Sequence, residues 1–110
     1  MPMATPINWP SEVVAAATIG FKAPVTGYLW MPEPEYPCLI GRVFMDRRGR
    51  FDDGRLIRTS AVMSLREEAG YLLAHTFSGS DYVLVQGVGQ PISNRDSFKS
   101  VIREPDSIVH

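Results

Sequence analysis

GRVFMDRRGRFDDGRLIRTS, residues 41–60, is the stretch that decides the fold of this chain. Two strand-like runs flank a loop rich in arginine, aspartate and glycine. The first run, 38–45, is apolar except at Arg42, as expected for a central strand that is covered on both faces. Asp53-Gly54 is a turn dipeptide, and 55–63 gives a further extended run. The stretch predicts two neighbouring strands joined by the densest cluster of potential binding groups in the chain.

Four further segments complete the predicted sheet. Residues 25–30 alternate in the manner of a strand, with aromatic side chains on one face. Prolines make 31–37 a stiff connector without regular pairing, and 64–70 reads as a single helical turn or a wide polar turn. The runs 71–77 and 82–88 alternate and are rich in aromatic and β-branched residues, which predicts a hairpin.

The two ends of the chain predict little regular structure beyond one short helix each. We expect an extended arm over 1–8, a helix within 9–20, a short helix over 93–103 and a tail over 104–110. The predicted fold class is therefore α+β, one domain with a small antiparallel sheet of about five strands over 25–88, or a partly closed barrel. A parallel α/β sheet is not expected, because no segment between the central strands is long enough for a crossover helix.

Composition restricts the function classes. The chain has 110 residues and a net charge of -1, which argues against a dedicated nucleic-acid protein, usually basic throughout. A single cysteine excludes an intramolecular disulfide and favours the cytoplasm. The longest apolar run, 13–19, is far shorter than a membrane span, so no membrane association is expected.

The inventory of reactive side chains predicts a protein that is not an enzyme. Cys38, His75 and His110 lack the spacing of a zinc site, so neither metal nor cofactor is expected. Cys38 and His75 fall within apolar runs, where such residues are usually inert core residues. The adjacent Glu67 and Glu68 do not converge as an acid and base pair.

The loop concentrates positive charge. Six arginines lie between positions 42 and 58 against three aspartates, so this segment carries +3 and the rest of the chain -4. Guanidinium groups recognise carboxylates and phosphates through paired hydrogen bonds, and a neighbouring aromatic ring can stack or anchor. The candidate binding residues are Arg47, Arg48, Arg50 and Phe51. The alternative is a solvated hairpin in which Arg50 pairs with Asp52 or Asp53.

A second candidate surface is aromatic. Trp30 and Tyr36 lie in or beside the proline-rich connector, with Tyr28, Met31, Glu33 and Glu35 as neighbours. Stiff aromatic segments lose little conformational entropy on binding.

A pattern of turn and strand residues resembles small uncharacterised proteins carried by bacteriophages and prophages. The matching positions span roughly the middle half of the chain: Gly41, Arg42, Val43, Arg50, Phe51, Asp53, Gly54, Ile57, Thr59, Ser60, Ser78, Gly79, Ser80, Tyr82 and Leu84. The resemblance implies a phage accessory protein in a bacterial host cytoplasm, of the kind that binds host machinery stoichiometrically, including anti-CRISPR and other anti-defence inhibitors. No catalytic residue is implied by it.

Two functional hypotheses follow. The first is a non-enzymatic protein that binds a host protein and inhibits or redirects it, through the arginine loop and the aromatic connector. The alternative is a phosphate-ligand binder, either a nucleic-acid-contacting module or a protein that sequesters a nucleotide signal. An exposed strand edge or the Trp30 region would also support a homodimer.

Overall fold

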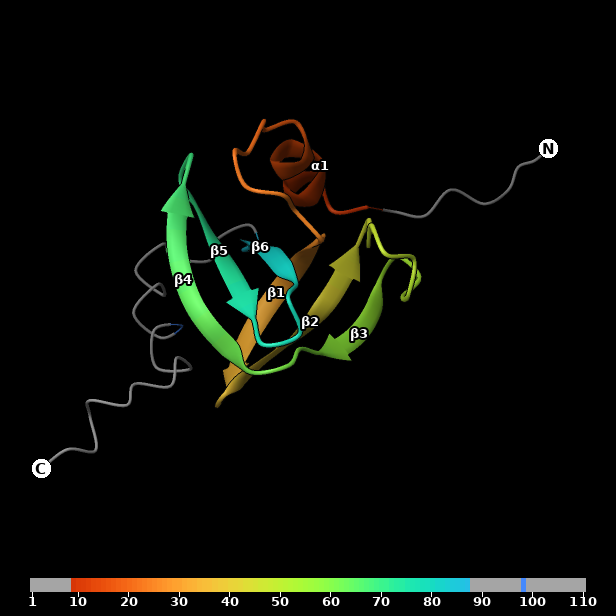
Figure 1. Cartoon of the computed structure of the whole chain (residues 1–110). Coiled ribbons are helices and arrows are strands. Elements are labelled where there is room, and N and C mark those ends of the chain that lie inside the picture. The colour runs from red at the N-terminus through yellow and green to blue at the C-terminus, as the bar shows by residue number, and fades with distance from the viewer. Residues whose placement is uncertain (1–8, 88–97, 99–110) are drawn as a thin grey trace, which may run out of the picture.

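The computed structural model describes residues 9–87 and Phe98. In this part of the chain one short helix accompanies six strands, which form a single open sheet (Figure 1). The elements are α1 (Ser11–Ala17), β1 (Gly27–Glu35), β2 (Cys38–Phe44), β3 (Arg55–Arg58), β4 (Val62–Glu68), β5 (Tyr71–Thr76) and β6 (Asp81–Val85). The strand order is β3-β2-β1-β6-β5-β4.

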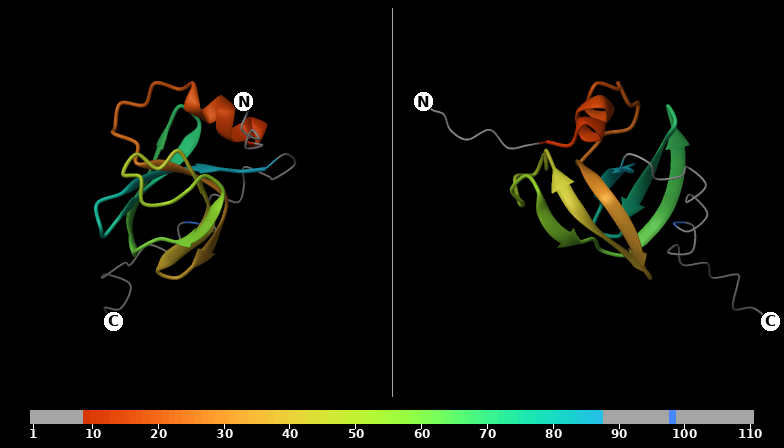
Figure 2. Two further views of the ribbon diagram at one scale, coloured as in Figure 1. Left: turned by 90° about the vertical axis from the view of Figure 1, so that its right-hand side faces the viewer. Right: turned by 180° about the vertical axis from the view of Figure 1, so that it is seen from behind.

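The domain is mostly β, and its six-stranded sheet is mixed, which corrects the prediction of a five-stranded antiparallel α+β domain. Four neighbouring pairs are antiparallel, but β1 and β6 run parallel, from Gly27 opposite Tyr82 to Trp30 opposite Val85. No crossover helix is needed, because the four intervening strands carry the chain back to the centre of the sheet. The sheet curls strongly, yet β3 and β4 remain its two edges, so it is not a closed barrel (Figure 2).

Apolar side chains pack on both faces of the curled sheet. The six-strand core takes one or more residues from every strand, with Phe98 among them: Leu29, Leu39, Val43, Ile57, Val62, Ala74, Tyr82, Leu84 and Phe98. The helix-side core lies on the other face, where α1 contributes Val13 and Ala16: Val13, Ala16, Phe44, Leu73, Val83 and Val85. Adjacent residues of β6 alternate between the two cores, as strand geometry requires.

The predicted proline connector is wrong, because β1 continues through it as far as Glu35. The register places Pro34 opposite Leu39 and Glu35 opposite Cys38, after a bulge between Trp30 and Glu33. Proline cannot donate to a ladder and is tolerated where a strand has only one neighbour. The pairing of β1 with β6 ends at Trp30, so the prolines lie where β1 needs hydrogen bonds on one side only.

The segment 64–70 is also corrected: it belongs to β4 rather than to a helical or wide polar turn. Glu68 lies opposite Tyr71, and only Ala69 and Gly70 separate them. Both connecting residues have positive φ, 54° and 85°, as a tight hairpin turn of matching twist requires. The run 55–63 divides into β3 and the start of β4.

Other predictions agree with the structure or lie outside it. The hairpin of 71–77 and 82–88 is confirmed as the antiparallel pair β5 and β6. The helix α1 lies within 9–20. The arm over 1–8, the helix over 93–103 except Phe98 and the tail over 104–110 fall outside the described residues. No helix in the described ranges is long and apolar enough to span a membrane.

Candidate functional site

The arginine loop, residues 46–54, is organised around the carboxylate of Asp46, whose side chain is fully buried. Its Oδ2 accepts the backbone N–H of Arg50 at 2.8 Å and of Phe51 at 3.1 Å, and its Oδ1 accepts that of Arg48 at 3.3 Å. Arg50 Nε lies 3.9 Å from the same carboxylate. One aspartate therefore fixes the backbone of three of the predicted binding residues.

Asp53 and Gly54 close the loop onto β2, which agrees with the turn role expected of them. Asp53 Oδ1 accepts the N–H of Met45 at 2.7 Å, and the N–H of Gly54 donates to the carbonyl of Val43 at 2.7 Å. Gly54 has a φ of 87°, a conformation that favours glycine. The expected ion pair of Arg50 with Asp52 or Asp53 is wrong, because its partner is Asp46.

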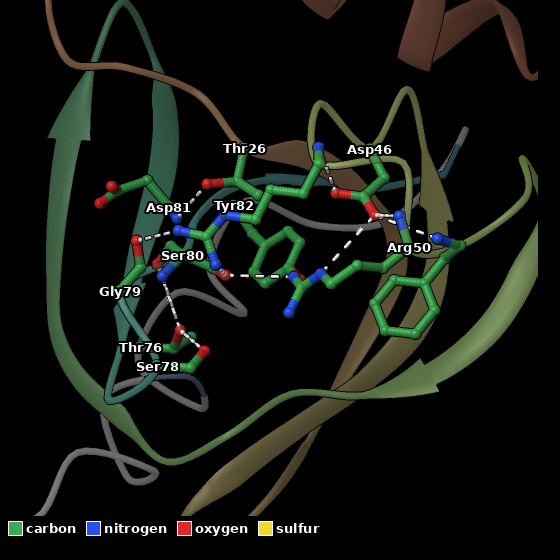
Figure 3. Close-up of polar contacts among 11 residues, drawn as sticks. Thr26, Asp46, Arg50, Thr76, Ser78, Gly79, Ser80, Asp81 and Tyr82 are labelled. Atoms are coloured by element: carbon green, nitrogen blue, oxygen red, sulfur yellow. Dashed lines mark hydrogen bonds and ion pairs between the residues drawn. The ribbon is translucent and has the colours of Figure 1, made fainter.

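Arg48 and Arg50 extend from this loop to the hairpin of β5 and β6. Figure 3 shows Arg50 reaching Ser80. Arg48 Nη1 donates to Ser80 Oγ at 3.3 Å, and Arg48 Nη2 donates to the carbonyl of Gly79 at 3.0 Å. Arg50 Nη2 donates to the same Ser80 hydroxyl and to Tyr82 Oη, both at 3.3 Å. Two guanidinium groups thus meet at one neutral hydroxyl, which the sequence spacing of about 30 residues did not reveal.

Phe51 differs from the exposed aromatic anchor that was expected. It is half-buried and packs against the six-strand core. The guanidinium carbons of Arg50 and Arg55 lie 5.1 and 6.0 Å from its ring centroid, within the range of cation–π attraction. Its ring therefore supports the arginines rather than standing free for a partner.

Arg47 faces a different part of the surface. Its backbone N–H donates to the carbonyl of Thr26, and its side chain lines a hollow of about 740 Å³ together with Lys22, Tyr28 and Met45. Burial raises the pKa of the Tyr28 phenol, and the charge of Arg47 opposes that rise. The three loop arginines consequently serve two separate surfaces.

Trp30 and Tyr36 do not form one aromatic surface either. Trp30 is half-buried and packs against the helix-side core. Tyr36 is 60% exposed in the turn between β1 and β2. It lies at the start of β2, whereas the arginine loop follows the end of that strand.

A contact surface that the sequence did not indicate lies beside Tyr36. Phe77 is 78% exposed and Met63 is 46% exposed. The segment of Met63 is bonded to the segments of both aromatic residues. Val62 N–H donates to the carbonyl of Pro37, next to Tyr36, and Phe77 N–H donates to the carbonyl of Ala61, both at 2.8 Å. We call Tyr36, Met63 and Phe77 the apolar rim. The one available signal was the position of Phe77 directly before the Ser78-Gly79 turn.

Groups considered for catalysis or metal binding have ordinary surroundings. His75 is exposed, not a core residue as expected, because its side chain lies on the helix-side face beyond the cover of α1 and bonds Asp81 at 2.8 Å through Nδ1. Cys38 is half-buried. Within residues 9–87 and Phe98, no three His, Cys, Asp or Glu side chains gather as a metal site would require.

The structure thus brings together Arg48, Arg50 and Phe51, and separates them from Arg47, Trp30 and Tyr36. Comparison with protein-family models, curated proteins and solved structures finds no match for this chain. Two features of the described surface go beyond what the fold requires: the apolar rim and the pair of guanidinium groups at Ser80.

Proposed function

We propose that this chain is a non-enzymatic accessory protein of the phage type, which binds a protein of its bacterial host in the cytoplasm and inhibits or redirects it. The apolar rim carries this proposal. Three exposed hydrophobic side chains, two of them aromatic, belong to three segments that backbone hydrogen bonds join. Exposed clusters of this composition are typical of protein-binding surfaces, where aromatic residues supply much of the affinity.

The rim is suited to binding because its backbone is already held. The hydrogen bonds of Val62 and Phe77 tie the rim segments together, and Ser60 Oγ accepts the N–H of Ser78 at 3.0 Å. A partner would therefore order side chains but little backbone, which lowers the entropic cost of association. The resemblance to phage accessory proteins supports a host protein as that partner.

Arg48 extends the proposed surface with positive charge. It is exposed, and it is bonded to Gly79, two residues after Phe77. A guanidinium group bonded two residues from an exposed ring favours a partner surface with an apolar depression and carboxylates.

The test is affinity capture from a bacterial host lysate with the tagged full-length protein, in parallel with Phe77→Ser and Val14→Ser. Val14 is 46% exposed on α1 and serves as the matched control. We expect a host protein in 1:1 ratio that Val14→Ser retains and that Phe77→Ser binds at least about tenfold more weakly, as for an interface hot spot. Circular dichroism confirms that both variants fold.

The proposal fails if no stoichiometric partner is recovered. It also fails if Phe77→Ser and Tyr36→Ser both bind the recovered partner as the unsubstituted protein does.

A further inference from the structure

The geometry points to a second site on this protein: Arg48 and Arg50, which the buried hydroxyls of Ser80 and Tyr82 hold in place, bind the terminal phosphate of a small phosphorylated molecule, such as a nucleoside monophosphate. This site shares Arg48 with the proposed protein-binding surface, but it does not depend on the apolar rim or on a host protein. It takes up the phosphate-ligand hypothesis but assigns it to a specific set of atoms from two distant segments.

The four side chains converge closely. Arg48 Nη1 and Arg50 Nη2 each lie 3.3 Å from Ser80 Oγ, and Arg50 Nη2 lies 3.3 Å from Tyr82 Oη. The two guanidinium groups therefore converge on one hydroxyl, that of Ser80. Figure 3 shows the position of Arg50 beside Ser80 and Tyr82. A pair of arginines fixed side by side is suited to the oxygens of a phosphate monoester.

The positive charge at this point is not fully balanced by the protein. Asp46 lies 3.9 Å from Arg50 Nε, and this is the one carboxylate that forms an ion pair with either guanidinium within the described part of the chain. The acceptors of Arg48, Ser80 Oγ and the Gly79 carbonyl, are both uncharged. Two like charges that share a neutral acceptor repel each other, and a bound anion removes that repulsion.

Hydrogen-bond donors remain for a ligand. Each guanidinium has five N–H groups. Arg48 directs one from Nη1 and one from Nη2 to the hairpin, and Arg50 uses Nη2 alone. The other N–H groups of Arg48 and those on Arg50 Nη1 have no acceptor among residues 9–87 and Phe98. Both side chains are accessible, that of Arg50 being 40% exposed.

Both sides of the site are held in place without a ligand. Asp46 fixes the arginine loop through three backbone N–H groups. Ser80 is buried and exchanges hydrogen bonds with Thr76: Ser80 N–H donates to Thr76 Oγ1 at 3.2 Å, and Thr76 N–H donates to the Ser80 carbonyl at 2.8 Å. A ligand would therefore meet preformed donors, with little ordering cost.

The charge distribution favours a single phosphate over a nucleic-acid backbone. The net charge is positive over residues 42–58, at +3, whereas the rest of the chain carries -4. Nucleic-acid binding generally needs an extended basic surface that follows many phosphates. One pair of guanidinium groups matches one dianionic group.

The test is titration of the full-length protein with inorganic phosphate, AMP and adenosine, followed by backbone amide NMR. We expect phosphate and AMP, but not adenosine, to shift the amides of Arg48, Arg50, Gly79 and Ser80. Arg48→Gln should weaken AMP binding at least about tenfold, since a hydrogen bond to a charged group is lost. Arg58→Gln removes an exposed arginine of β3 and should change the affinity less than about twofold.

Two further arms separate this proposal from its rivals. Arg48→Lys keeps the charge and should bind AMP with intermediate affinity, and Phe77→Ser should bind it unchanged even if it loses a host protein. The proposal is overturned if phosphate and AMP leave these amides unshifted at tens of millimolar, if Arg58→Gln loses as much affinity as Arg48→Gln, or if only an oligonucleotide binds, with a steep salt dependence.

Discussion

At the scale of single residues, two of the three aspartates of the arginine loop are structural groups. Asp46 and Asp53 accept backbone N–H groups and thereby set the path of the chain, while two guanidinium groups reach the opposite hairpin. The loop 46–54 has three arginines and three aspartates. Its arginines are nevertheless incompletely neutralised, because the carboxylates of Asp46 and Asp53 bind backbone N–H groups.

Replacing Asp46 by alanine tests this role. Three backbone N–H groups lose a charged acceptor, and we expect the free energy of unfolding to fall by about 2–3 kcal/mol. Urea denaturation measures the change. Asp52→Ala, at an exposed position, is the control and should stay within about 0.5 kcal/mol. An equal loss in both variants would contradict the structural role of Asp46.

At the scale of elements, the packing of β1 on β2 depends on a residue without a side chain. A Cβ at Gly41 would lie 2.9 Å from Leu29 Cγ, 3.1 Å from the Trp30 carbonyl oxygen and 3.2 Å from Pro32 Cα. These contacts lie beside the bulge of β1 between Trp30 and Glu33. Gly41 thus allows the irregular part of β1 to approach the centre of the sheet.

Gly41→Ala should overpack this contact and lower the free energy of unfolding by about 1–3 kcal/mol. Gly20→Ala is the matched control, since a Cβ there has nothing within 4 Å, and it should leave stability nearly unchanged. Chemical denaturation of both variants compares them directly. A fully stable Gly41→Ala protein would show that β1 can move away from β2 at little cost.

At the scale of the whole molecule, the six-strand core includes one residue from beyond the sheet. Phe98 is 2% exposed and packs with residues from all six strands. Because the sheet is open, its inner core depends on this additional ring.

Phe98→Ala should therefore lower the free energy of unfolding by about 3–5 kcal/mol, as for other large cavities. Phe77→Ala removes a ring that is 78% exposed and should change stability by less than about 0.5 kcal/mol. Thermal unfolding followed by circular dichroism distinguishes them. Equal stability of the two variants would show that Phe98 does not complete the core.

Local patterns predicted the features that depend on neighbours in sequence. Alternation in 71–77 and 82–88 indicated the hairpin of β5 and β6, and Asp53-Gly54 indicated the turn before β3. The proline-rich part of β1 was misread because propensity cannot show that a strand has a neighbour on one side only. Of the candidate binding residues, Arg48, Arg50 and Phe51 lie together, whereas Arg47, Trp30 and Tyr36 lie elsewhere.

By itself the sequence determined a small β-rich domain, because strand alternation and turn chemistry act over a few residues, and it placed a net charge of +3 in residues 42–58. The tertiary structure alone decided that β6 lies parallel to β1, that Arg48 and Arg50 meet Ser80, and that Phe77 stands exposed near Tyr36. These relations join segments about 30 to 55 residues apart. They arise from the curl of the whole sheet, which no local pattern encodes.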